Sequence, residues 1–207
     1  MGIGALNSPV TQGGYANKEM LDIWSVRTQL QSLLDVEVAM AKTQAELGTI
    51  PLNAAQEIEE NAVCSDDLFQ KVLAGKAGHP LVAILDAIRS ELPDDAVGWV
   101  HFGATSQDIL DTGRALQIKK SLELLSQNLS SLQKNVRSLA GKYSETLMVA
   151  RTNGQNALPT TLGMRFARWA SELERSRQRI TDGTPRWTMV QFSGAVGTYA
   201  AMGKDGM

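Results

Sequence analysis

Apolar residues between positions 115 and 139 recur in steps that alternate between three and four, the spacing of one face of an α-helix. This seam consists of Ala115, Ile118, Leu122, Leu125, Leu129, Leu132, Val136 and Leu139. The pattern predicts one long helix over residues 105–140, which at about 1.5 Å per residue would be roughly 50 Å long. Because such a seam packs against a partner helix, we expect an elongated bundle.

Further helices are predicted on both sides of this long helix. Asn17 can cap a helix that runs to Leu47, where Gly48 provides a stop. Pro80 suits the first position of a helix that continues to the break at Pro93. The remaining expected helices lie at 54–62, at 66–73, and from Leu162 through Ile180 to a stop at Gly183 and Pro185.

No segment alternates apolar and polar residues over the length of a strand, so the sequence predicts an all-α fold. We expect a flexible lead-in at 1–16 and a small helical N-terminal domain at 17–100. Residues 101–207 are expected to form the first part of a domain built as an elongated helical bundle with long central helices. Two long helices with apolar seams leave apolar surface uncovered, and association of several copies would cover it.

Composition narrows the class of protein. The formal net charge of −2 gives no reason to expect nucleic acid or an anionic membrane as a partner. No apolar run approaches the roughly 18 residues of a membrane span, and residues 1–14 lack the basic and apolar regions of a signal peptide. The one cysteine, Cys64, excludes an internal disulfide and has no cationic sequence neighbour that would activate it. The expectation is a soluble cytoplasmic protein with an inert thiol.

The residues at the start of the long helix are the first that could bind a ligand. Thr105-Ser106-Gln107-Asp108 matches the Ser/Thr-x-x-Asp/Glu pattern of a capping box. The same residues could instead bind a carboxylate or phosphate, because a helix N-terminus offers free N–H groups and two hydroxyls stand beside them. His101 lies close enough in sequence to donate to the same anion, and both interpretations remain open.

Two further stretches each have a structural and a functional interpretation. His79 precedes the expected helix start at Pro80, where it can be a cap, a half-buried polar group or a catalytic residue. In the stretch from Arg151 to Gln155, Asn-Gly indicates a plain turn. The concentration of hydrogen-bonding side chains in the same stretch indicates a binding loop.

Several chemistries find no match in the sequence. It contains no Gly-rich loop followed by Lys-Ser/Thr, no Cys or His cluster with metal-ligand spacing, and no Gly-x-Ser-x-Gly elbow. Gly194-Ala195-Val196-Gly197 lacks the strand and the third glycine of a dinucleotide site. We interpret these small residues as close helix packing or as a substrate-facing turn.

Together these stretches resemble the fumarase/aspartase superfamily of lyases. The most specific is His101–Thr112, which reads His-Phe-Gly-Ala-Thr-Ser-Gln-Asp-Ile-Leu-Asp-Thr. The other matching stretches, in the family's order and spacing, are Tyr15–Trp24, the helix through Glu37 to Pro51, Arg151–Gln155, Ala157–Pro159 and Ser193–Thr198. The similarity covers nearly the whole chain, and the nearest branches resemble adenylosuccinate lyase and 3-carboxy-cis,cis-muconate cycloisomerase.

The resemblance implies an L-aspartase-like homotetramer in which each active site combines segments of three subunits. It implies β-elimination without a metal or organic cofactor: a base removes a proton next to a carboxylate, and the C–N or C–O bond at the β-carbon breaks. The implied ligand is a small dicarboxylate-bearing substrate. The adenylosuccinate branch releases fumarate in purine biosynthesis, whereas the muconate branch closes a lactone in aromatic degradation.

The resemblance assigns roles only to residues of this chain that match the family's motifs. The positions that the resemblance implies for substrate binding are His101, Thr105, Ser106, Thr152 and Gln155. His79, in Gly-His-Pro-Leu-Val-Ala, aligns with an active-site histidine of the adenylosuccinate branch. The muconate branch usually lacks this histidine, so His79 favours the adenylosuccinate branch.

The sequence departs from the family at three places. Asn153 stands where adenylosuccinate lyases have the histidine assigned as general acid, and an amide cannot exchange a proton near neutral pH. The mobile loop Gly-Ser-Ser-x-Met-Pro-x-Lys-x-Asn, which carries the family's base, does not occur. Gly14 stands where purine-using members often have a phosphate-binding arginine. We therefore expect the N-terminal part of a longer lyase, inactive by itself.

Three functions stay open. An adenylosuccinate-lyase-like enzyme is favoured by His79, by the run from His101 to Asp108 and by Ser193–Thr198. A 3-carboxy-cis,cis-muconate cycloisomerase is the alternative, because that branch also lacks a histidine at the position of Asn153. A non-catalytic helical scaffold of the same fold would account for both Asn153 and the missing loop.

Overall fold

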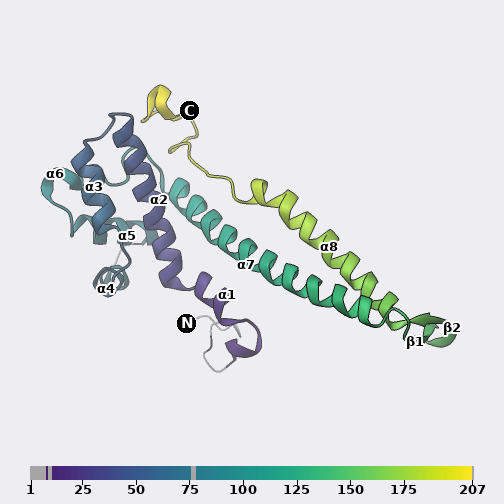
Figure 1. Cartoon of the computed structure of the whole chain (residues 1–207). Helices are drawn as coiled ribbons and strands as arrows, with labels where there is room; N and C mark the ends of the chain where they lie inside the picture. The colour runs from purple at the N-terminus through teal and green to yellow at the C-terminus, as the bar shows by residue number, and fades with distance from the viewer. Residues whose placement is uncertain (1–7, 9–10, 76–77, 207) are drawn as a thin grey trace. The chain divides into compact units, whose positions relative to one another are not determined.

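The computed structural model describes residue 8 and residues 11–75 and 78–206 (Figure 1). Its helices are η2 (Gln12–Gly14), α1 (Lys18–Ile23), α2 (Val26–Glu46), α3 (Leu52–Asn61), α4 (Asp66–Ala74), α5 (Pro80–Arg89), α6 (Asp94–Val97), α7 (Ser106–Lys142), α8 (Leu162–Trp187) and η3 (Gly203–Gly206). One hairpin, of β1 (Leu147–Thr152) and β2 (Gln155–Thr161), completes the described elements. The predicted all-α class is confirmed, with the hairpin as an addition. No described helix is long and apolar enough to cross a membrane.

The chain divides into two compact units. The first consists of Met1–Ile118 and Thr188–Met207, and the second consists of Lys119–Trp187. Helix α7 contributes its N-terminal part to the first unit and its C-terminal part to the second. The expected boundary after residue 100 and the lead-in at 1–16 stay predictions, and residues 1–7 and 9–10 of that lead-in lie outside the described residues.

One predicted helix is two helices in the structure. The Asn17 side chain accepts a hydrogen bond from Met20 N at 3.0 Å and caps α1, as expected. The Ser25 side chain accepts a hydrogen bond from Thr28 N at 3.2 Å and caps α2. The prediction of a single helix over 17–47 was wrong. Apolar periodicity alone does not show where a single serine caps a new helix.

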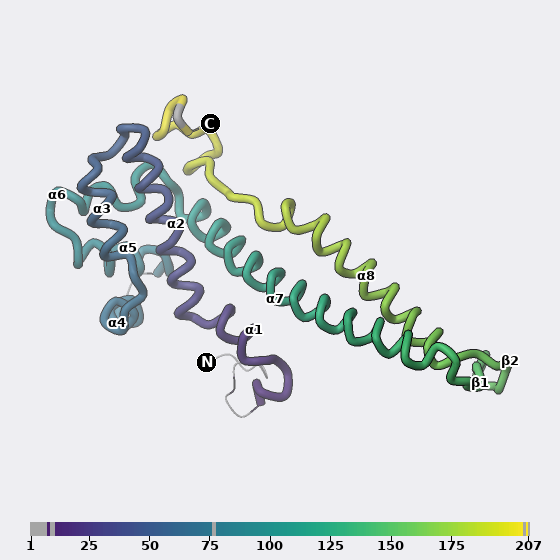
Figure 2. The backbone as a smooth tube through the Cα atoms, in the orientation of Figure 1, coloured from purple at the N-terminus to yellow at the C-terminus, as the bar shows by residue number. Residues whose placement is uncertain are grey.

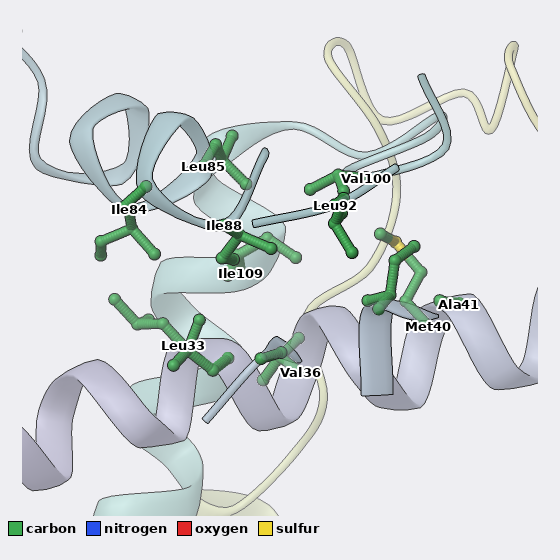
Figure 3. Packing of buried hydrophobic residues seen from close by; sticks show 14 of the residues in the cluster. Leu33, Val36, Met40, Ala41, Ile84, Leu85, Ile88, Leu92, Val100 and Ile109 are labelled. Carbon is green, nitrogen blue, oxygen red and sulfur yellow. The ribbon is translucent and has the colours of Figure 1, made fainter. Parts of the chain in front are cut away.

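Helices α2, α3, α5 and the first turns of α7 build the core of the first unit. Ile58 of α3, Ile88 of α5 and Ile109 of α7 are fully buried. In Figure 3, Leu33 and Val36 of α2 lie across from Ile88 and Ile109. Burial of one such side chain contributes about 1.5–3 kcal/mol, so this packing fixes the beginning of α7 firmly against α2.

The apolar seam of α7 is only partly buried within the two units. Ala115 and Val136 are buried, whereas Leu125 and Leu132 remain 41% and 48% exposed. Outside the seam, the polar side chain of Gln117 is also buried, and its Nε2 donates a hydrogen bond to Ile23 O at 2.8 Å. The seam therefore leaves apolar surface uncovered on the longest helix.

The segment after α7 forms a β-hairpin that the sequence analysis missed. Strands β1 and β2 pair antiparallel, and the pairing is irregular between Val149 and Arg151. At the turn, Asn153 has φ 50° and Gly154 has φ 75°, the positive values of a type I′ turn. The prediction of no strand was wrong because both faces of the hairpin are largely exposed, so the sequence has no alternation of apolar and polar residues there.

Helix α8 extends to Trp187, beyond the predicted stop at Gly183 and Pro185. Gly183 is buried inside the helix because the Trp187 ring packs against it, at a distance that leaves no room for a Cβ. Pro185 lies in the last turn of α8, so the helical hydrogen bond that its missing N–H cannot make is one of the last in the helix. In the second unit Gln133 Nε2 of α7 donates to Glu174 Oε2 of α8 at 2.6 Å, which confirms that the two long helices pack together.

Candidate functional site

A buried carboxylate organises the N-terminus of α7. Asp108 is fully buried, and its Oδ2 accepts a hydrogen bond from Thr105 N at 3.0 Å. This bond is one of the two hydrogen bonds of the predicted capping box; Asp108 N donates to the backbone Thr105 O at 3.0 Å and not to the Thr105 hydroxyl. The N–H groups of Ser106 and Gln107 make no hydrogen bond within the described residues, so they remain available to an anion.

Asp108 also holds a segment far along the chain, a role that the sequence analysis missed. Its Oδ1 accepts from Ser193 N and its Oδ2 accepts from Gly194 N, both at 3.0 Å. One turn further, Thr112 Oγ1 donates to Gln191 O at 2.8 Å and accepts from Gln191 N at 3.1 Å. The chain after α8 therefore returns to the first turns of α7 (Figure 2). The spacing of Asp108 and Thr112 on one helix face is the sequence signal that could have indicated this.

The glycine-rich stretch from Gly194 to Gly197 forms a turn. Gly194 and Gly197 have φ values of 75° and 76°, and Gly197 N donates to Gly194 O at 3.4 Å. Only glycine adopts such angles without strain. The interpretation as close helix packing was therefore wrong, and a turn that faces the substrate stays a prediction.

A glutamate of α2 holds His101. His101 Nδ1 lies 2.7 Å from Glu37 Oε1, and the two side chains are 15% and 1% exposed. The contact uses Nδ1, so Nε2 is the second ring nitrogen. Glu37 was not among the predicted site residues. The available signal was a lone acidic residue between the apolar Val36 and Val38.

The backbone turn at His101 has an unfavourable conformation. His101 has φ 64°, a left-handed value that costs a residue with a side chain about 1–2 kcal/mol. Gln44 Nε2 donates to Phe102 O at 2.8 Å and holds this turn in place. Glu37 and Gln44 lie seven residues apart, two turns along α2, so one helix face contacts both His101 and Phe102.

His79 is the N-cap of α5. Its Nδ1 accepts a hydrogen bond from Leu81 N at 3.3 Å, and Pro80 is the first residue of the helix. The cap interpretation is confirmed, and a catalytic role stays a prediction. No hydrogen bond among the described residues joins His79 to His101.

The remaining predicted site residues lie at the tip of the hairpin in the second unit. Thr152 pairs with Gln155 across the turn formed by Asn153 and Gly154, and all four residues are exposed. The plain-turn interpretation is confirmed, and substrate contact stays a prediction. These residues belong to a different unit from His101, Thr105 and Ser106.

The second unit is strongly cationic. Its sequence contains twelve lysines and arginines and five aspartates and glutamates, a formal net charge of +7, whereas the rest of the chain carries −9. Arg151 of β1 and Arg165 and Arg168 of α8 line a concavity of about 840 Å³. None of these three arginines forms an ion pair with the described acidic residues. A surface of this charge attracts anionic ligands.

Cys64 does not belong to the candidate site. Burial raises the pKa of its thiol, and the nearby Arg27 guanidinium opposes that shift more weakly. The thiol therefore stays protonated, in agreement with the expected inert cysteine, although the structure supplies a cation that the sequence did not indicate. Among the described residues, no group of three or more His, Cys, Asp or Glu side chains could hold a metal ion.

The fold is that of a mostly helical protein with one small hairpin. The family model described as Lyase matches residues 13–206, so the chain belongs to this lyase family, in the fumarase/aspartase superfamily that the sequence resembles.

Relatives from two branches match along the same part of the chain. Adenylosuccinate lyase of Methanocaldococcus jannaschii is 40% identical over 195 residues, which are 93% of this chain and 42% of that protein. The 3-carboxy-cis,cis-muconate cycloisomerase of Pseudomonas aeruginosa is 37% identical, over 91% of this chain and 42% of that protein. The crystal structure of fumarate lyase from Mesorhizobium sp. BNC1 has a TM-score of 0.86 at 34% identity, over 92% of this chain and 45% of that one. The chain thus spans less than half the length of these relatives.

Proposed function

We propose that this chain is part of a longer lyase that catalyses β-elimination with release of fumarate, most like adenylosuccinate lyase. The observation that carries the proposal is 40% identity to an adenylosuccinate lyase along 93% of the chain. The free N–H groups at the start of α7 and the +7 charge of the second unit support an anionic substrate. The proposal includes a role in purine nucleotide biosynthesis and a cytoplasmic location.

In this proposal the substrate carboxylates bind at two places. His101, Thr105 and Ser106 form the first, where the dipole and N–H groups of α7 favour a carboxylate. The same donors would stabilise the additional negative charge of an aci-carboxylate intermediate. Thr152 and Gln155, at the hairpin tip, form the second, which another subunit would contribute, because the family resemblance implies sites built from three subunits. No metal or organic cofactor takes part.

The proposed catalytic positions are His79 and Asn153, and of the two only His79 can transfer a proton. Asn153 can donate a hydrogen bond but cannot exchange a proton near neutral pH. His79 engages Nδ1 in the cap of α5, so Nε2 is its nitrogen for proton transfer. The family's base-carrying loop has no match in the 207 residues, so the proposal assigns turnover to the longer protein.

The test is turnover of adenylosuccinate by the longer protein, followed by absorbance. We expect fumarate release, with kcat/KM lowered on the order of tenfold to a hundredfold by Ser106→Ala, because one carboxylate donor is lost. Ser130→Ala, the same substitution at an exposed position of α7, serves as the control and should leave the rate unchanged. A protein that leaves adenylosuccinate intact contradicts the proposal.

A second candidate is a 3-carboxy-cis,cis-muconate cycloisomerase, favoured by Asn153 and by 37% identity to such an enzyme. Lactone formation from 3-carboxy-cis,cis-muconate, without fumarate release from adenylosuccinate, would establish it. Inertness toward both substrates, retained in an Asn153→His variant, would instead identify a non-catalytic scaffold.

We further propose that the longer protein is a homotetramer. Leu125 and Leu132, 41% and 48% exposed on α7, support this because long helices with uncovered apolar seams are covered by association. Light scattering coupled to size-exclusion chromatography measures the mass, and a monomer would contradict the proposal.

A further inference from the structure

Glu37 is a buried charged residue to which the proposed function gives no role. Its side chain is 1% exposed, and its Oε1 contacts His101 Nδ1 at 2.7 Å. Its other oxygen, Oε2, is buried without a hydrogen-bond partner in the described part of the chain. An unpaired carboxylate oxygen in a protein interior is unfavourable, so stability alone does not account for a glutamate at this position.

The contact has a defined consequence for His101. A carboxylate at this distance accepts a hydrogen bond from Nδ1–H and so orients the ring. His101 makes no other side-chain hydrogen bond within the described residues, and 15% of its side chain is exposed. Nε2 is therefore the ring nitrogen left to contact a ligand.

Helix α2 holds the turn around His101 in a backbone conformation that is unfavourable for a residue with a side chain. The residue keeps φ 64° while Glu37 fixes its side chain and Gln44 fixes the next carbonyl, that of Phe102. Gln44 Oε1 is also buried without a partner in the described residues. One helix thus supplies two incompletely satisfied polar side chains to hold one strained turn, a combination that is typical of functional positions.

We propose that Glu37 is a positioning residue: it fixes the Nδ1–H tautomer and the orientation of the His101 imidazole, so that Nε2 is presented to the substrate. This inference deepens the proposed function and rests on it for the substrate. The tautomer, however, is a property of the chain itself and can be measured without turnover.

The first experiment measures that tautomer in the 207-residue chain. The chain has two histidines, so ¹⁵N-histidine labelling gives ring-nitrogen signals from His79 and His101 alone, and His79→Gln distinguishes them. We expect His101 to be protonated at Nδ1, and to change to the Nε2–H tautomer of free imidazole in Glu37→Leu. A wild-type His101 protonated at Nε2 alone overturns the proposal, and so does an unchanged tautomer in a folded Glu37→Leu variant.

The second experiment measures the effect on catalysis in the longer protein. Glu37→Gln keeps the shape of the side chain and removes its charge, and Glu46→Gln makes the same change at an exposed position of α2. We expect Glu37→Gln to lower kcat/KM on the order of tenfold to a hundredfold and to shift its pH profile, with the Tm unchanged or raised. Glu46→Gln should change neither.

The outcomes separate positioning from a merely structural role. A lower Tm with an unchanged pH profile would make Glu37 a structural residue, and unchanged kinetics would remove its role altogether. If the longer protein has no lyase activity, the proposed function fails, whereas the tautomer experiment still decides whether Glu37 sets the state of His101.

Discussion

Gly194 N donates a hydrogen bond of 3.0 Å to Asp108 Oδ2, joining residues that are 86 positions apart in the sequence. The same carboxylate accepts from Thr105 N and Ser193 N. One buried side chain therefore fixes both the N-terminus of α7 and the turn that begins at Gly194.

Asp108→Ala is expected to destabilise the chain strongly. The substitution leaves three backbone N–H groups without their acceptor, and each unsatisfied buried donor costs about 1–3 kcal/mol. We expect the free energy of unfolding to fall by about 3–5 kcal/mol, measured by urea denaturation. Asp111→Ala, one turn further on α7, is the control and should stay within about 0.5 kcal/mol. Equal stability of the two variants would show that the carboxylate does not anchor Ser193 and Gly194.

Acid should weaken the second unit through Glu174. Hydrogen bonds from Arg177 and Gln133 lower the pKa of this carboxyl to about 2. Because the pKa is lower in the folded than in the unfolded chain, the stabilisation is present above the unfolded value of about 4.3. It is lost as the pH falls toward 2.

The measurement compares unfolding of the wild type and Glu174→Gln between pH 7 and pH 2. We expect the variant to be the less stable at neutral pH and the difference to disappear in acid. Glu172→Gln, two residues away on α8, should follow the wild type. A constant difference across this pH range would contradict the role of the Glu174 charge.

Two glycines of the second unit should respond to alanine in opposite directions. A Cβ on Gly163 would lie 2.5 Å from Ala140 O and 2.6 Å from Ser144 Cα, both backbone atoms. Gly163→Ala is therefore expected to lower the free energy of unfolding by about 1–3 kcal/mol or more.

Gly141, near the end of α7, has nothing within 4 Å of such a Cβ. Gly141→Ala should stabilise by about 0.5–1 kcal/mol, because alanine favours the helix. Thermal unfolding checks both, and a stable Gly163→Ala variant would contradict the close packing of α8 on α7.

Asn153→His tests the missing acid in the longer protein. The turn has φ 50° at this position, a left-handed conformation that the chain already adopts at one histidine, His101, with φ 64°. If Asn153 limits an adenylosuccinate lyase, a histidine should raise kcat by up to the 10²–10⁴-fold that general acid catalysis typically supplies. Asn153→Gln is the control, because it keeps an amide. A kcat that does not rise would mean that the acid is another residue, such as His79.

Local patterns predicted much of the fold, including the helix starts beside several candidate site residues. The seam from Ala115 to Leu139 determined α7 nearly to its ends, and the cap residues Asn17 and His79 marked helix starts that the structure confirms. The hairpin was not predicted because its strands are largely exposed on both faces and therefore lack a periodic pattern of apolar residues. It is defined by the pairing between β1 and β2. Local spacing is readable because helix hydrogen bonds and side-chain neighbours lie within a few residues of each other.

The contacts that shape the site were decided only by tertiary structure. Glu37 and His101 are 64 residues apart, and Asp108 and Ser193 are 85 apart. The sequence by itself determined which stretches are helices and which polar residues begin them. Only folding decided that an acid of α2 meets His101 and that Asp108 meets a distant backbone, because these bonds depend on how apolar helix faces pack together and not on any repeat along the chain.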